Sequence, residues 1–257
     1  MKVAIDLSVL RRPLKQALET AARLGATGVV FDARNDLRPS ELSDTGRRQL
    51  KKMMEDLGLK VAGVRFPTRR GYDVAADLDR RIDATKEAMS FAYRLGAAVV
   101  INAVGRVTDD ESHPAYQQLQ SSLADLAKHG QHVGAMLACE TGTEPVSRLC
   151  GLLESLEEKA IGVALNPGQL IVSDHFSEAS VREAKDWTLA VIANDGVQDL
   201  SLGRGLAVPL GQGSADVPEL LGALEEQRYQ GWFTVGRRNA ENSIQELADS
   251  VSYLRAI

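Results

Sequence analysis

Residues 77–104 read DLDRRIDATKEAMSFAYRLGAAVVINAV, and this stretch contains the unit from which the fold is built. Its first part, Asp77–Leu95, has the amphipathic pattern of a helix, and it is followed by Gly96, a residue that often ends helices. Its second part, Ala98–Val104, is a short and almost continuously apolar run, which is typical of a strand buried on both faces of a parallel sheet. The stretch therefore predicts a helix followed by a buried strand.

The same alternation extends along the whole chain. Apolar runs of strand length recur eight times, at Val3–Leu7, Gly28–Asp32, Val61–Phe66, Ala98–Val104, Ala135–Glu140, Ile161–Leu165, Leu189–Ala193 and Trp232–Val235. Further helical segments are Leu14–Leu24, Ser40–Leu57, Glu219–Gln227 and Ser243–Ala256. Strand–helix alternation repeated eight times predicts a parallel sheet with right-handed crossovers, and a closed (β/α)₈ barrel, or TIM barrel, is the commonest eightfold form.

An open, doubly wound sheet is the alternative fold. It would carry a glycine-rich fingerprint after the first strand, and Leu7-Ser8-Val9-Leu10 contains no glycine. No linker rich in proline, glycine and serine and no block of like charges divides the chain. We therefore expect an α/β protein with one eight-stranded parallel TIM barrel as a single domain over residues 1–257, since barrels of about 250 residues are routinely one domain.

The composition narrows the classes of partner. The net charge is −5 and both signs are mixed along the chain, which argues against a nucleic-acid partner. Met1-Lys2 leads directly into a strand-like run, so we expect no signal peptide, and no apolar run approaches the roughly 20 residues of a membrane span. Cys139 and Cys150 form no metal or redox motif. A cytoplasmic protein that contacts neither membrane nor nucleic acid is expected.

Arginines are the most frequent charged residues where chemistry is expected. Active sites of TIM barrels lie at the carboxyl ends of the strands and in the loops that follow. Because a guanidinium fork suits carboxylate or phosphate, these arginines predict a pocket for an anionic sugar. The alternative is pairing with acidic residues of the same loops, which include Asp32, Asp36, Asp73, Asp109, Asp110 and Glu111. The arginines are Arg11, Arg34, Arg65, Arg69, Arg70, Arg106, Arg204, Arg237 and Arg238.

Four motifs in the second half of the chain resemble those of the xylose isomerase-like superfamily. Residues 137–142 (LACETG) resemble its strand 5 motif, and residues 165–170 (LNPGQL) resemble its strand 6 motif, where aspartate normally precedes Pro-Gly. Residues 192–195 (IAND) align with a strand 7 motif usually written His-x-x-Asp. Residues 209–213 (PLGQG), Asp216 and 229–236 (YQGWFTVG) resemble the approach to strand 8, which normally ends in glutamate and here ends in glycine. The resemblance covers nearly the whole chain and is weak before about residue 60.

The resemblance implies a particular site. The superfamily includes sugar isomerases and epimerases, inosose dehydratase-like enzymes and the apurinic endonuclease family 2 barrels. Its members hold one divalent metal through Glu, Asp, His and Glu, the metal acts as a Lewis acid, and the two glutamates move a proton. The matching positions here are Glu140, Asn166, Ile192 and Gly236, of which only Glu140 keeps its chemistry. Because Mg²⁺ and Mn²⁺ select several oxygen ligands, mostly carboxylates, we expect no metal cofactor and no two-base epimerisation of the usual form.

Eight residues are the resulting candidates for the site. Glu140 is expected to contact the ligand, or to form a salt bridge with an arginine such as Arg106 or Arg237. Asp195 and His175 are further catalytic candidates, although a solvated loop residue is the favoured interpretation of His175. The glycine-bearing loops 203–205 and 211–213 are candidates for phosphate binding or simple turns. The substrate-binding candidates are Arg65, Asn102, Arg106, Asn166 and Arg237.

These observations give three hypotheses for function. The first is a barrel that binds a small, carbohydrate-like or anionic sugar ligand and has reduced or no isomerase activity. The second is an active sugar isomerase or epimerase that uses Glu140 with substitute ligands, and only this hypothesis requires Mg²⁺, Mn²⁺ or Zn²⁺. The third is a non-catalytic scaffold or regulatory partner protein. An endonuclease is less favoured, because the zinc-cluster members need several histidines at strand ends. A monomer and a homodimer both stay open as assemblies, although barrels of this family often pair.

Overall fold

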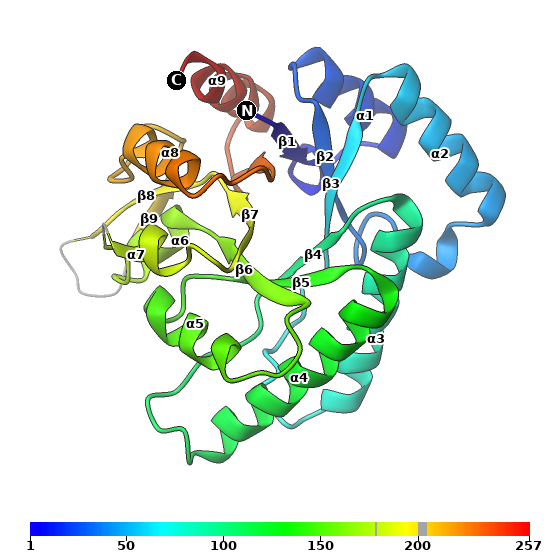
Figure 1. The fold of residues 1–257 in the computed structure, drawn as a ribbon. Coiled ribbons are helices and arrows are strands. Elements are labelled where there is room, and N and C mark those ends of the chain that lie inside the picture. The colour runs from blue at the N-terminus through cyan, green and yellow to red at the C-terminus, as the bar shows by residue number, and fades with distance from the viewer. Residues whose placement is uncertain (178, 200–204) are drawn as a thin grey trace.

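Eight parallel strands close into a barrel in the computed structural model, which describes residues 1–177, 179–199 and 205–257. β1 pairs with both β2 and β10, so the ring of strands has no free edge. Helices surround the ring (Figure 1). The predicted eight-stranded (β/α)₈ barrel is confirmed. The strands are β1 (Val3–Asp6), β2 (Gly28–Asp32), β3 (Lys60–Arg65), β4 (Val99–Asn102), β5 (Met136–Glu140), β6 (Ile161–Leu165), β7 (Thr188–Ile192) and β10 (Phe233–Val235).

The predicted helices are present, with small differences at their ends. Ser40 does not begin the second helix, because a short 3-10 turn precedes it, and Ser43 instead caps α2 by accepting from the backbone N–H of Gly46 at 3.1 Å. Asp216 caps α8, which therefore begins at Val217. The helices are α1 (Leu14–Arg23), α2 (Asp44–Asp56), α3 (Leu78–Leu95), α4 (Pro114–Val133), α5 (Val146–Glu154), α6 (Pro167–Val172), α7 (Ala179–Glu183), α8 (Val217–Glu226) and α9 (Ser243–Ala256), with 3-10 turns η1 (Leu7–Leu10) and η2 (Pro39–Glu41).

Alternate residues of the strands pack on opposite faces of the barrel wall. A small buried cluster combines residues from four neighbouring strands, and it consists of Ile101, Ala138, Ala164, Ala190 and Ile192. The residues between them, such as Leu137 and Val191, belong to the larger core under the helices. The small cluster therefore fills the inside of the ring, as is usual for TIM barrels. Cys139 is fully buried in the larger core, and burial raises the pKa of its thiol. None of the helices among the described residues combines the length and hydropathy needed to cross a membrane.

A two-stranded antiparallel sheet, absent from the sequence prediction, follows β7. It consists of β8 (Asp195–Val197) and β9 (Leu206–Val208). The side chain of Asp195 is fully buried and accepts four backbone N–H groups. Its Oδ1 accepts from Gly196 at 2.8 Å and Ala215 at 3.0 Å, and its Oδ2 accepts from Gly211 at 3.0 Å and Gly213 at 2.9 Å.

These contacts assign Asp195 a structural position. The carboxylate anchors the loop that connects β9 to α8, and the catalytic role predicted for Asp195 finds no support in a side chain shielded from solvent. The N–H groups of Gly211 and Gly213 donate hydrogen bonds to Asp195. They stabilise the turn before α8 and are not free to bind a phosphate. The other loop predicted to bind phosphate or form a turn is 203–205, and its residues Gly203 and Arg204 lie outside the described residues.

We predict that Asp195→Ala lowers the free energy of unfolding by about 2–4 kcal/mol, because four backbone donors lose their acceptor at once. Urea denaturation monitored by circular dichroism measures this change. The control is Asp216→Ala, which removes one capping interaction and is expected to cost about 1 kcal/mol. Equal losses in the two variants would contradict the anchoring role of Asp195.

Candidate functional site

An arginine at the end of β3 pairs with the glutamate at the end of β5. Nη2 of Arg65 donates to Oε2 of Glu140 at 2.5 Å, and Nη1 lies 3.8 Å from Oδ2 of Asp6. The side chains of Arg65 and Glu140 are only 14% and 13% exposed. Burial lowers the pKa of Arg65, but the carboxylates of Glu140, Asp6 and Asp32 more than offset this effect and leave that pKa raised. Arg65 therefore remains a cation beside Glu140.

The second oxygen of Glu140 is also occupied. Oε1 accepts from Nδ2 of Asn166 at 2.8 Å, and Oδ1 of Asn166 accepts from the backbone N–H of Gln169 at 3.1 Å, which caps α6. The side chains of Asp6, Arg65, Glu140 and Asn166 thus form one polar chain across the ends of β1, β3, β5 and β6. The structure brings together three of the predicted site residues here. The predicted arginine partners of Glu140, Arg106 and Arg237, were wrong, because Arg65 reaches it instead.

The four positions at which the family resemblance implies a metal do not fit a divalent cation. Glu140 is bonded to Arg65 and Asn166, and Ile192 packs inside the barrel. Gly236 has a φ of +153°, and an added Cβ would lie 2.9 Å from Cβ of Asp6, so no side chain fits at this position without a shift. Over residues 1–177, 179–199 and 205–257, no group of three or more His, Cys, Asp or Glu side chains is arranged to hold a metal.

Asn102 supports the connection between β3 and α3. It is 2% exposed, and its Nδ2 donates to the hydroxyl of Tyr72 at 2.8 Å, while its Oδ1 accepts from the backbone N–H of Thr68 at 3.3 Å. The hydroxyls of Tyr72 and Thr85 are 2.7 Å apart, and burial raises the pKa of Tyr72 to about 12. The predicted substrate contact of Asn102 stays a prediction, since its bonds hold the loop that carries Thr68.

Three further candidates lie apart from the Arg65–Glu140 pair. Arg237 donates twice to Glu246 of α9, from Nε at 2.7 Å and from Nη2 at 2.6 Å. The expected acidic partners were loop residues, whereas the observed partner is on a helix. Arg106 is exposed and forms no ion pair with a described residue. His175 is half-buried in the loop after α6, and its ring contacts neither Glu140 nor Arg65 through a hydrogen bond among the described residues.

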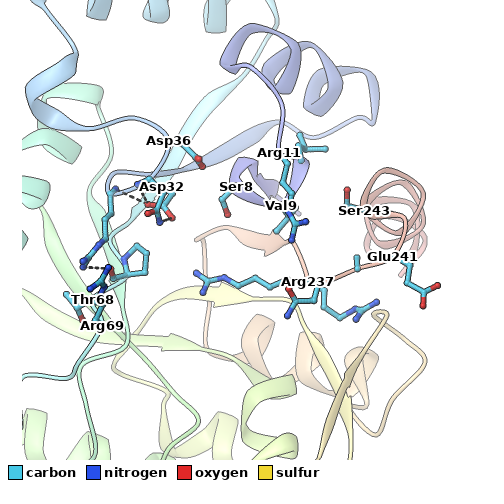
Figure 2. A pocket seen from close by; sticks show the side chains of 17 residues that line it. Ser8, Val9, Arg11, Asp32, Asp36, Thr68, Arg69, Arg237, Glu241 and Ser243 are labelled. Carbon is cyan, nitrogen blue, oxygen red and sulfur yellow. Dashed lines mark hydrogen bonds between the residues drawn. The ribbon is translucent and has the colours of Figure 1, made fainter.

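A pocket of about 610 Å³ opens at the ends of β10, β1, β2 and β3, which are consecutive in the barrel. Figure 2 shows Asp32, Thr68 and Arg69 on one side of this pocket, with Arg11 and Arg237 on the other. We call it the mouth pocket. The positions implied for the metal lie mostly at β5, β6 and β7, so the open space occupies the other half of the mouth. Its lining comprises Ser8–Arg11, Asp32, Arg34–Asp36, Pro67–Arg69, Arg237–Glu241 and Ser243.

Positive charge predominates in the mouth pocket. Five arginines line it against three carboxylates. Both oxygens of Asp32 are occupied, because Oδ1 accepts from the backbone N–H groups of Arg34 at 2.8 Å and Asn35 at 2.9 Å, and Oδ2 accepts from Nδ2 of Asn35 at 2.8 Å. Arg11, Arg69 and Arg238 form no ion pair with any residue that the structure describes. Only Arg237 of the eight chosen candidates lines the pocket. The other arginines were visible in the sequence as members of the strand-end set, but nothing there separated them from solvated residues.

Asp36 is the titratable group of the mouth pocket that the sequence analysis treated only as an arginine partner. Its pKa is raised, first by partial burial and then by the negative charges of Asp32 and Asp6. In the sequence, the sign of a shifted pKa was that a second aspartate, Asp32, lies four residues before Asp36. The carboxyl of Asp36 therefore keeps its proton to a higher pH than an ordinary aspartate does.

The first residue of α9, Ser243, also lines the mouth pocket. The start of a 14-residue helix carries the positive end of the helix dipole, which favours an anion, and the side chain of Asn242 caps the N–H group of Gln245 there. This element adds to the arginines a second source of positive potential.

Comparison with known proteins gives the family. Residues 18–257 match the family described as Xylose isomerase-like TIM barrel. The chain belongs to this family. No curated protein sequence matches it.

Solved structures agree with this xylose isomerase-like fold. A xylose isomerase domain protein from Planctomyces limnophilus is similar with a TM-score of 0.86 and 19% identity, over 99% of this chain and 95% of that one. D-psicose 3-epimerase, solved in the presence of D-fructose, has a TM-score of 0.78 and 14% identity, over 100% and 99% of the two chains. The 3-keto-D-glucoside 4-epimerase YcjR from E. coli has a TM-score of 0.76 and 13% identity, over 99% and 98%. At these identities the similarity shows the fold alone.

We predict energetic coupling between Arg65 and Glu140 of this xylose isomerase-like barrel. Arg65→Met and Glu140→Gln should each lower the free energy of unfolding by about 3 kcal/mol, because each leaves a largely buried polar group without its partner. The double variant should lose less than the sum by about 1–3 kcal/mol. Urea denaturation of the four proteins in the cycle measures this coupling.

The matched control is the exposed pair Lys52–Asp56, whose side chains are 70% and 60% exposed. The cycle Lys52→Met and Asp56→Asn should show a coupling below about 0.5 kcal/mol. Strict additivity at Arg65 and Glu140 would mean that the two side chains do not form the pair.

Proposed function

We propose that this barrel binds an anionic sugar, a sugar phosphate or a sugar acid, in the mouth pocket without a divalent metal, and that the metal-dependent isomerase chemistry of its family is reduced or lost. One observation carries the proposal. The mouth pocket is lined by five arginines, and three of them, Arg11, Arg69 and Arg238, form no ion pair with a described residue. Unpaired guanidinium groups around a pocket of about 610 Å³ favour a ligand that supplies the anion.

The remaining lining of the mouth pocket suits the rest of a sugar. The carboxyl group of Asp36 can accept hydrogen bonds from ligand hydroxyls, while the arginines and the start of α9 favour the anionic end. The raised pKa of Asp36 reduces its repulsion of an anion as the pH falls. The pocket therefore favours a molecule with hydroxyls along one part and a phosphate or carboxylate at one end.

The Arg65–Glu140 pair supports the loss of the family chemistry. A guanidinium offers hydrogen-bond donors only, so it cannot coordinate two substrate oxygens as a metal does. Transfer of a proton between the two faces of a sugar carbon needs two groups, and Cβ of Asp6 leaves no space for a second carboxylate at Gly236 without a shift. An isomerase that uses Glu140 as its base would first have to release this side chain from both Arg65 and Asn166.

The proposal also includes a cytoplasmic location for the protein. Cys139 and Cys150 are both free and buried, which supports a reducing compartment such as the cytoplasm. The scaffold hypothesis differs from ligand binding in one measurable respect, because a scaffold would not be stabilised by sugars.

We predict that fructose 6-phosphate and gluconate raise the melting temperature of the metal-stripped protein, whereas neutral fructose does not. At about 100 times the dissociation constant a ligand contributes about 2.7 kcal/mol, which corresponds to an increase of about 5–10 °C for a chain of this length. Differential scanning fluorimetry after treatment with a chelator and dialysis measures the shift. Arg69→Gln should reduce it, and Arg48→Gln, which removes an exposed charge on α2, should not.

Two results would reject the proposal. One is the absence of a shift with every anionic sugar of a broad panel. The other is a shift that appears only after Mg²⁺ or Mn²⁺ is added back, because it would restore the metal-dependent hypothesis.

A further inference from the structure

A second pocket, of about 630 Å³, adjoins the mouth pocket on the outer side of the β3–α3 connection. We call it the side pocket. It lies between η2, the loop after β3 and the first turns of α3, and it shares Arg34, Thr68 and Arg69 with the mouth pocket. Because these residues line both pockets, a single extended ligand could contact both.

The side pocket is more strongly cationic than the mouth pocket. Two acidic residues line it, Asp77 and Glu87, against six arginines. This excess of positive charge contrasts with the net charge of −5 of the whole chain. None of the chain's lysines lines either pocket, so the positive groups are all guanidinium forks, which suit planar or tetrahedral oxyanions. The six are Arg34, Arg38, Arg69, Arg70, Arg80 and Arg81.

Three of these arginines are available to a ligand. Arg38 pairs with Glu41 at 3.1 Å, and Arg81 is used to hold the loop. Arg69, Arg70 and Arg80 form no ion pair with any residue in the described part of the chain. They are contributed by two elements, the loop after β3 and the first turn of α3, that meet at the side pocket.

The backbone that carries these arginines is held in place. Arg81 donates from Nη1 to the carbonyl of Ala76 at 2.8 Å, and from Nη2 to the carbonyl of Gly71 at 3.0 Å and to that of Val74. Asn102 fixes the same loop at Thr68. A loop with this many internal bonds loses less conformational entropy when a ligand binds than a free loop would.

We propose that the side pocket is a second anion subsite, and that the ligand of this barrel carries two anionic groups, one in each pocket, with Arg69 between them. This inference rests on the proposed function, which places the first anionic group in the mouth pocket. Phosphate and carboxylate share the chemistry that the arginines recognise, so the test separates these two sources.

The test compares ligands that differ by one anionic group. Isothermal titration calorimetry at a salt concentration that screens exposed charges measures fructose 6-phosphate against fructose 1,6-bisphosphate, and gluconate against glucarate. In at least one of these pairs the doubly anionic ligand should bind about tenfold more tightly, because its second group reaches Arg70 and Arg80. An advantage in the first pair identifies phosphate as the second group, and an advantage in the second pair identifies carboxylate.

Variants of the side-pocket arginines test whether the second anionic group binds there. The double variant Arg70→Gln/Arg80→Gln should reduce the advantage to about twofold or less and leave the affinity for the singly anionic ligand unchanged. Arg48→Gln, which removes a charge of the same sign from α2, should change neither affinity. Circular dichroism confirms that each variant is folded.

The outcomes separate the two proposals. Equal affinities within both pairs of ligands would overturn the second subsite while the mouth pocket stands. An advantage that survives in the Arg70→Gln/Arg80→Gln variant would overturn the placement in the side pocket. If none of the four probes binds, the proposed function fails, and the second subsite fails with it.

Discussion

The ion pair between Arg65 and Glu140 limits the chemistry available at the mouth of this barrel. A carboxylate that is 13% exposed requires a nearby positive charge, and the guanidinium at the end of β3 supplies it at 2.5 Å. A divalent metal in that place would offer open coordination positions to substrate oxygens, whereas a guanidinium offers only N–H donors. Since Asn166 occupies the other oxygen of Glu140, both carboxylate oxygens accept a hydrogen bond from another side chain.

The glycine at position 236, where the family motif has glutamate, is related to the position of the mouth pocket. At Gly236, which follows β10, an added Cβ would lie 2.9 Å from Cβ of Asp6, and Asp6 in turn lies beside Arg65. With the half of the mouth near β5 and β6 filled by Glu140 and Asn166, the pocket opens over β10, β1, β2 and β3. Arginines from four loops line this half, and their guanidinium groups are the basis of the proposed anion site.

Hydrophobic periodicity was sufficient to predict the barrel. The apolar run of β6 and the amphipathic pattern of α9 gave both elements with their observed ends, because a buried strand and a surface helix place different constraints on successive residues. The β8–β9 sheet was missed, since two strands of three residues, one of them largely exposed, carry no such pattern. Local sequence thus predicts elements that bury a whole face and not those held by a few backbone bonds.

The site was only partly predictable for a related reason. The motifs placed Glu140 and Asn166 at neighbouring strand ends, which parallel pairing then brings together. Which arginine reaches Glu140 depends on a span across the barrel from β3 to β5, and sequence spacing does not give that direction. Likewise, the position of Asp195 three residues after Ile192 gave no sign of the four N–H groups that surround it, because three of them come from residues 211–215.

The most direct measurement of whether a guanidinium has replaced the metal is X-ray diffraction at the manganese absorption edge from crystals soaked in excess Mn²⁺. We expect no anomalous peak next to Glu140, with Arg65 in hydrogen-bond contact with its carboxylate. A peak at coordination distance from Glu140, with Arg65 displaced, would contradict the assignment of this mouth as a metal-independent anion site.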